Sequence, residues 1–270
     1  MASPRIIFLH IPKTAGQSVH EFITGLHQPE EICPARLNPQ LFAMTIPELR
    51  RYRVFSGHLD WNALDCLEGP RFVFTVLREP VERILSFYFY LRDKAANTAP
   101  EVLATPGHEG MKAILNLPVD EYFACKEPGL RNFLDNHYDN FYTFYFAGRH
   151  YAARQQLRSS QAVEKSLNDK RFVEMALENL GCLDGVYTMS QLDLLQRDLE
   201  AVTGRHNPVI TLKNFRLNAR DADRRNRREE LVRLGATATT FQRIAQMTRL
   251  DRQVWETLTR RHEAAPAALA

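Results

Sequence analysis

Residues 5–26 read RIIFLHIPKTAGQSVHEFITGL, and this stretch decides the fold that the sequence predicts. Its first seven residues are largely apolar and rich in β-branched side chains, and they end at Pro12, which is the pattern of a buried strand. In the second half, apolar residues recur at the spacing of one helix face: Val19, Phe22, Ile23 and Leu26. The chain is therefore expected to open with a strand, a short turn and a helix.

The same order of elements returns further along the chain. Residues 71–77, RFVFTVL, predict the clearest strand, and residues 80–92 predict a helix that starts with Pro80 in its first turn. Further strands are expected at 54–57 and 182–188, and further helices at 47–51, 172–180, 190–202 and 240–261. Repeated strand–helix alternation favours a parallel sheet with helices on both faces. We therefore expect an α/β protein with a P-loop-like three-layer fold, in which a central parallel sheet is flanked by helices.

The composition argues against several classes of protein. Of the 270 residues, 44% are hydrophobic and 25% are charged, and the net charge is only +3, as in an ordinary soluble domain. The four cysteines form no Cys-x-x-Cys pair, so we expect free thiols in a reducing compartment rather than disulfides or a zinc site. No segment approaches the ~20 apolar residues that span a bilayer, and no secretory signal is visible. The sequence therefore predicts a cytoplasmic protein with no membrane partner.

Between the first strand and the first helix lies the heptapeptide PKTAGQS, residues 12–18. A turn at this place leaves backbone N–H groups unpaired and directed at one point, which makes a binding site for an anion. Ala15 and Gly16 let the backbone approach a phosphate closely, and Lys13 adds a mobile positive charge. The residues expected to contact the phosphate are Pro12, Lys13, Thr14, Ala15, Gly16, Gln17 and Ser18. The loop is not a Walker A motif, because in G-x-x-x-x-G-K-[ST] the lysine follows the second glycine.

A second candidate anion site follows the strand at 71–77. Arg78, Glu79 and Pro80 stand at its end, and Ser86 lies about one and a half turns into the following helix. The carboxyl ends of parallel strands meet at one edge of a sheet, so Arg78 is expected on the same edge as the first loop. The two sites would then hold anions at opposite ends of one nucleotide.

Both motifs carry a family resemblance. The segments FLHIPKTAG, residues 8–16, and FTVLREP, residues 74–80, together with Ser86, resemble the carbohydrate-type sulfotransferases related to heparan sulfate 2-O-sulfotransferase, as a soluble, bacterial-like member. The resemblance returns in the sequence DGVY that begins at Asp184, and it is weak between residues 97 and 148. Two positions depart from the pattern of that family. Gln17 stands where threonine or serine is usual, and Glu79 stands where aspartate is commoner.

The resemblance implies a donor and the residues that bind it. The donor would be 3′-phosphoadenosine-5′-phosphosulfate (PAPS), which leaves the 3′,5′-bisphosphate PAP as product, and no metal is expected. The first loop would bind the 5′-phosphosulfate, and Arg78 with Ser86 would bind the 3′-phosphate. A late loop would close on the 3′-phosphate and the adenine. Its match in this chain is the segment KNFR that begins at Lys213, with Asn214 and Arg216 as contacts.

Transfer of a sulfuryl group to a hydroxyl requires stabilisation of charge and a base. In a loose transition state, positioning and cationic stabilisation carry most of the catalysis, and Lys13 is the candidate for the bridging and sulfuryl oxygens. His58, in the segment FSGHLD, resembles the histidine that serves relatives as general base. Relatives often have two histidines two residues apart, and here the earlier position is Ser56. Glu79 is the alternative base.

The sequence defines the acceptor less well than the donor. Eight aromatic residues gather between residues 123 and 146, which suits a small-molecule or carbohydrate hydroxyl but is also typical of a core. We expect one sulfotransferase domain, with a nucleotide-binding frame at 5–93 and 182–262 and an acceptor-side insertion at about 97–150. The arginine-rich stretch 216–233 alternates with acids, so binding to nucleic acid is not expected. Nothing in the sequence indicates the oligomeric state.

Two other functions are compatible with parts of the pattern. A P-loop-like nucleotide kinase would need a Walker A lysine and an acid that holds magnesium, and neither is evident in the sequence. A non-catalytic nucleotide- or glycan-binding protein would not need Lys13, Arg78, Ser86 and His58 together. The sequence therefore favours a PAPS-dependent sulfotransferase.

Overall fold

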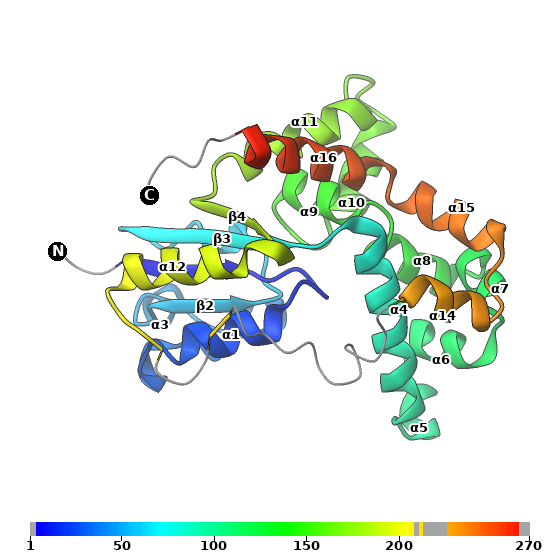
Figure 1. Ribbon diagram of the computed structural model, residues 1–270, viewed down its shortest axis with the longest axis horizontal. Helices are drawn as coiled ribbons and strands as arrows, with labels where there is room; N and C mark the ends of the chain where they lie inside the picture. The colour runs from blue at the N-terminus through cyan, green and yellow to red at the C-terminus, as the bar shows by residue number, and fades with distance from the viewer. Residues whose placement is uncertain (1–3, 208–210, 213–225, 265–270) are drawn as a thin grey trace. The chain divides into compact units, whose positions relative to one another are not determined.

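The computed structural model describes residues 4–207, 211–212 and 226–264 (Figure 1). The chain divides into two compact units, Met1–Arg78 with Glu178–Ala222 and Glu79–Leu177 with Asp223–Ala270. Each unit has its own hydrophobic cluster, as an independently packed body requires. Among the described residues, no helix is long and apolar enough to cross a membrane.

The first unit is built on a parallel four-stranded sheet. Its strands are β1 (Arg5–Leu9), β2 (Val54–Gly57), β3 (Arg71–Leu77) and β4 (Gly185–Thr188), in the order β2-β1-β3-β4. All three neighbouring pairs are parallel, and Ile6 on β1 stands opposite Val54 on β2 and Phe72 on β3. The expected α/β class with a central parallel sheet is thus confirmed. The predicted strands at 54–57 and 71–77 coincide with β2 and β3.

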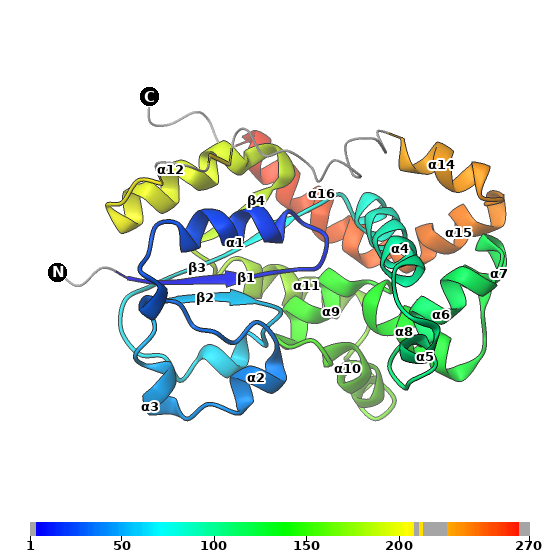
Figure 2. The same cartoon turned by 90° about the horizontal axis from the view of Figure 1, so that it is seen from below.

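Helices α1 (Gly16–Thr24) and α12 (Leu192–Thr203) pack on one face of this sheet (Figure 2). Their apolar faces meet alternate residues of the strands, as the two-residue period of a strand demands. The buried members of this cluster include Ile6, Phe8, Val19, Phe22, Phe74, Val76, Leu195 and Leu199. The shorter elements of the unit are η1 (Pro29–Glu31), α2 (Asn38–Phe42), α3 (Ile46–Leu49), η2 (Asn62–Leu64) and η3 (Met189–Gln191).

The second unit is helical. Its elements are α4 (Pro80–Ala96), α5 (Pro100–Leu103), α6 (Glu109–Asn116), α7 (Val119–Ala124), α8 (Pro128–His137), α9 (Phe141–Gly148), α10 (Ala153–Gln161), α14 (Arg227–Arg233), α15 (Ala238–Met247) and α16 (Arg249–Ala264). Helix α11 (Asp169–Leu180) runs from this unit into the first. Seven of the eight aromatic residues between 123 and 146 are buried, and the eighth, Phe133, is partly buried against the core. These aromatic residues therefore form the interior of the unit.

The single helix predicted over residues 240–261 is wrong, because α15 ends at Met247 and α16 begins at Arg249. Asn140, on the segment before α9, causes the break. Its backbone N–H donates to the carbonyl of Met247 over 2.6 Å, and its side-chain oxygen accepts from the N–H of Leu250 over 2.7 Å. These bonds replace the intrahelical partners that a continuous helix would supply. A partner more than a hundred residues away leaves no sign in the local pattern.

Candidate active site

Candidate residues follow three neighbouring strands and lie at one edge of the sheet. β1 leads into the loop 12–18, β2 leads into His58, and β3 leads into Arg78. Because these strands are parallel, their carboxyl ends lie at the same edge. The chain moves away from β1 first toward β2 and then toward β3, so the topological switch point lies between β1 and β3. Open α/β sheets bind their ligands at such a point, outside the carboxyl ends of the strands.

The loop after β1 has a strained backbone. Lys13 and Ala15 adopt left-handed φ angles of 72° and 64°, a conformation that costs a residue with a side chain about 1–2 kcal/mol. Thr14 between them is fully buried, and its hydroxyl donates a hydrogen bond of 2.8 Å to the carbonyl of Ile11. This hydrogen bond therefore stabilises the conformation of the loop. Strain of this kind is typical of ligand-binding loops, where the surrounding fold maintains it.

The helix that follows the loop begins without a side-chain cap. Ala15 is the N-cap residue of α1, and the N–H of Val19 donates to its carbonyl over 3.1 Å. The N–H groups of Gly16, Gln17 and Ser18 precede that bond in the first turn, where a helix supplies no acceptor. They also lie at the positive end of the helix dipole, so this turn is suited to an anion. The side chain of Gln17 is exposed and donates to Glu21 over 2.8 Å, along the helix.

His10 explains why glycine stands at position 16, where α1 begins. A Cβ atom on Gly16 would lie 1.5 Å from Nε2 of His10, so no other residue fits at this position without displacing the ring. The ring of His10 is stacked on those of Phe8 and His58, with centroids 5.3 and 4.3 Å away. Burial, followed by the repulsion that a protonated His58 would exert, holds the pKa of His10 well below its usual value of 6.5. His10 is therefore a neutral packing group against the start of α1.

Arg78 contacts the loop directly. Its Nη1 donates to the carbonyl of Lys13 over 3.2 Å. Nearby, the hydroxyl of Thr75 on β3 donates to the carbonyl of Leu9 on β1 over 2.9 Å. These two bonds join the ends of β1 and β3. A guanidinium has five N–H donors in a fixed fork, so one bond to the loop is compatible with binding of an anion.

His58 is held in one orientation and one tautomer. Its Nδ1 lies 2.8 Å from the carbonyl oxygen of His10. A carbonyl can only accept, so Nδ1 carries the hydrogen and Nε2 is the nitrogen that can take up a proton. Burial lowers the pKa of His58 below 6.5, and the bond to His10 offsets this in part. The ring is therefore neutral at pH 7, as a general base must be.

Two residues of this site are absent from the candidates that the sequence identified. Nδ1 of His20 on α1 lies 3.0 Å from the hydroxyl of Ser56, and burial lowers the pKa of His20 to about 4. Arg36 accepts the backbone N–H of His58 at its carbonyl over 2.8 Å, and its charge adds to the effect of burial on the pKa of His58. His20 could have been identified from helical spacing, because it lies one turn beyond Gly16 on α1. No local pattern identifies Arg36, because only the fold brings it beside His58.

The other candidates belong to the second unit or to residues that the structure does not describe. Ser86 is on α4 in the second unit, and its hydroxyl is buried with no hydrogen-bond partner among the described residues. Glu79 caps α4, because its carboxylate accepts the N–H of Glu82 over 2.7 Å. Asn214 and Arg216 lie outside the described residues. In the described ranges, no three His, Cys, Asp or Glu side chains are grouped so as to hold a metal ion.

The parallel sheet, the strained loop and the uncapped helix start are together typical of an α/β protein with a P-loop-like fold. The family model described as "Sulfotransferase family" matches residues 2–177, which is more than half of the chain. The chain therefore belongs to the sulfotransferase family. The resemblance to sulfotransferases that the two motifs carry is confirmed by this match.

A curated relative matches a shorter part of the chain. The protein-tyrosine sulfotransferase of Arabidopsis thaliana is 30% identical over 93 residues, which make up 34% of this chain and 18% of that relative. The chain thus matches less than a fifth of the length of that relative.

Proposed function

We propose that this protein transfers a sulfuryl group from PAPS to an acceptor hydroxyl by in-line displacement. The observation that carries the proposal is the placement of an anion-binding loop, Arg78 and a neutral His58 at one edge of the sheet. Membership of the sulfotransferase family supports the reaction class. When bound, PAPS would supply an activated sulfuryl group together with a bisphosphate leaving group.

The donors at the sheet edge fit the anionic groups of PAPS. The first turn of α1 offers backbone N–H groups, and Ala15 and Gly16 carry almost no side chain. Pro12, Lys13, Thr14, Ala15, Gly16, Gln17 and Ser18 would form the cradle for the 5′-phosphosulfate. Arg78 would bind the 3′-phosphate, and the hydroxyl of Ser86, which has no partner in the part of the chain that the structure describes, would be a second donor. Asn214 and Arg216 complete the proposed set, outside the described residues.

His58 and Lys13 have distinct roles in the proposal. Nε2 of His58 would take the proton from the acceptor hydroxyl, since Nδ1 already donates to His10. The ammonium of Lys13 would stabilise negative charge on the sulfuryl and bridging oxygens, where a mobile point charge is useful. The cap that Glu79 provides to α4 favours His58 over Glu79 as the base.

The acceptor in this proposal is a hydroxyl of a small molecule or a carbohydrate. The aromatic residues between 123 and 146 give that choice little support, because they form the interior of the second unit. The name of the Arabidopsis relative adds a phenolic hydroxyl of tyrosine to the acceptors that should be tested. The four free cysteines support a reducing, cytoplasmic location.

Calorimetric titration with PAP, compared with ATP–magnesium and with AMP, tests the donor. We expect binding of PAP that requires the 3′-phosphate and that is weakened at least tenfold in Arg78→Ala, because the guanidinium is a charge-assisted donor. Transfer of labelled sulfate from PAPS to a panel of sugars, phenols and tyrosine peptides then identifies the acceptor. Preference for ATP–magnesium, or binding of PAP no tighter than AMP, would refute the proposal in favour of a kinase or a binding protein.

A further inference from the structure

A cavity in the second unit is rich in positive charge. Its volume is about 480 Å³, within the range of small-molecule sites. It lies between α15, the end of α7 and the start of α8, and it shares no residue with the candidate active site. The charged and polar side chains that line it are Lys126, Arg131, Thr239, Gln242, Arg243 and Gln246.

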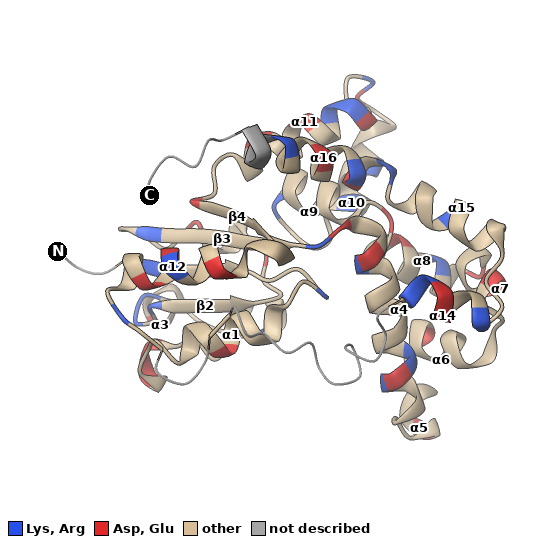
Figure 3. Ribbon diagram, in the orientation of Figure 1, with Lys and Arg blue, Asp and Glu red and all other residues tan. Residues whose placement is uncertain are grey.

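One face of α15 supplies most of this lining. Thr239, Gln242, Arg243 and Gln246 stand at positions i, i+3, i+4 and i+7, which is a single stripe along a helix. The buried side of the same helix is formed by Thr240, Ile244 and Met247. Arg243 is the one charged residue within the α15 sequence ATTFQRIAQM (Figure 3). The packing of α15 therefore presents hydroxyl, amide and guanidinium donors to the cavity, and no carboxylate.

The acids near the cavity have partners elsewhere. Asp135 forms ion pairs with Arg131 over 2.6 Å and with Arg154 over 3.5 Å, so its charge is shared between two guanidinium groups. Glu127 accepts the N–H groups of Gly129 and Leu130 at the start of α8. Neither acid lines the cavity. The lining itself therefore carries three cations and no carboxylate.

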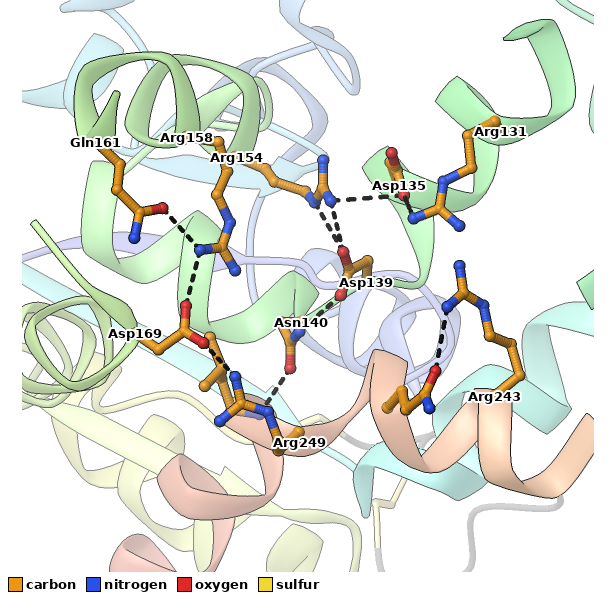
Figure 4. A network of polar contacts seen from close by, with 12 residues as sticks. Arg131, Asp135, Asp139, Asn140, Arg154, Arg158, Gln161, Asp169, Arg243 and Arg249 are labelled. Carbon is orange, nitrogen blue, oxygen red and sulfur yellow. Dashed lines mark hydrogen bonds and ion pairs between the residues drawn. The ribbon is translucent and has the colours of Figure 1, made fainter. Parts of the chain in front are cut away.

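Arg131 and Arg243 approach the cavity from two helices. Figure 4 shows their guanidinium groups turned toward one another from α8 and α15. Nη1 of Arg243 donates to Gln246 over 3.1 Å, whereas its buried Nε–H has no hydrogen-bond partner among the described residues. An anion between the two guanidinium groups would be attracted to both charges. A guanidinium also presents paired donors that match the oxygens of a tetrahedral oxyanion.

We propose that this cavity binds the sulfate or phosphate ester group of a small organic molecule. Lys126, Arg131 and Arg243 neutralise the ester oxygens, and the amides and hydroxyl of α15 bind the rest of the ligand. The volume exceeds what a bare ion needs, so the ligand is a molecule of about the size of a sugar. The site is separate from the loop 12–18, so it can be tested without reference to PAPS.

The test is a titration of the full-length, nitrogen-15-labelled protein followed by NMR, at constant ionic strength. The probes are glucose 6-sulfate and glucose 6-phosphate, and glucose is the uncharged control. We expect both esters to shift the amide signals of residues around Lys126, Arg131 and 239–246 in a saturable way. Glucose should leave those signals unchanged. If only one ester binds, that ester identifies which oxyanion the site takes.

Variants separate this site from the candidate active site. Arg243→Gln should weaken ester binding about tenfold, which corresponds to about 1.4 kcal/mol. Lys112→Gln, an exposed change on α6, and Lys13→Gln, a change in the loop, should both leave it unaffected. The proposal is overturned if neither ester shifts these signals, if Arg243→Gln binds the esters as tightly as the original protein, or if Lys13→Gln alone abolishes the shifts.

Discussion

Replacing Asp251 with asparagine should change how the stability of this protein depends on pH. Asp251 on α16 is fully buried, and it caps a different helix, α9. Its carboxylate accepts the N–H of Tyr142 over 3.1 Å and both the N–H and the hydroxyl of Thr143 over 2.8 and 2.9 Å. Asn140, the N-cap residue of α9, makes no side-chain cap bond, so Asp251 performs that role.

The magnitude follows from the pKa of this carboxyl. Burial raises the pKa of Asp251 from 3.8 to about 6, although the nearby Arg83 and the bonds from Thr143 and Tyr142 act in the opposite direction. The folded protein then holds this proton more tightly than the unfolded chain does. Stability from this group is therefore gained as pH falls from about 6 to about 4, and lost as pH rises through the same interval. At 1.36 kcal/mol for each pKa unit, the full gain is about 3 kcal/mol, of which about 2 kcal/mol is reached by pH 4.

The assay is urea unfolding of the original protein and of Asp251→Asn at several values between pH 4 and pH 7. Every other titrating group is common to both proteins, so the difference in their free energies of unfolding isolates Asp251. On acidification from pH 7 to pH 4, that difference should shift by about 2 kcal/mol in favour of the original protein. A difference that stays constant with pH, or that shifts toward the variant on acidification, would refute the reasoning.

Three further predictions concern the candidate active site. Gly16→Ala should destabilise the protein by about 1–3 kcal/mol in urea unfolding, because the added Cβ would collide with His10. The same change should weaken PAP binding in calorimetry. Arg78→Ala should raise the dissociation constant of PAP at least tenfold, as measured by calorimetry. Lys13→Ala should mainly lower kcat, as measured in a transfer assay. His58→Ala should nearly abolish transfer and spare PAP binding. Since burial lowers the pKa of His58, the rate in the original protein should fall only below pH 6.5, as His58 takes up a proton.

Each of these predictions has a matched control and a contrary result. Lys112→Ala and Arg252→Ala, both at exposed positions of the second unit, should change neither PAP binding nor transfer. Unaltered PAP binding in Gly16→Ala would show that the loop tolerates a side chain. Equal effects of Arg78→Ala and Lys13→Ala on kcat and affinity would argue against their separate roles. Full transfer by His58→Ala would show that another group acts as the base.

Much of the first unit could be predicted because its signals are local. A run of apolar and β-branched residues marks β3. Arg78, Glu79 and Pro80 mark the turn that follows it. The start of α4 matches the prediction, because Pro80 and the cap from Glu79 are neighbours in sequence. The predicted strand at 182–188 begins later, at Gly185. Before it, Asp184 pairs with Val73 through both its backbone N–H and its side chain, which hold the chain beside β3.

The strand–loop–helix opening, the parallel sheet and the residues that follow three of its strands could all be predicted from the order of the amino acids. Those features depend on hydrophobic periodicity, on proline and glycine, and on short spacings, all of which can be read from the sequence. The tautomer of His58, the contacts of His20 and Arg36, and the break between α15 and α16 depend instead on contacts between distant segments. The cationic cavity likewise depends on residues from separate helices. Hydrogen bonds and burial between distant segments fix these features, and such partners exist only once the chain has folded.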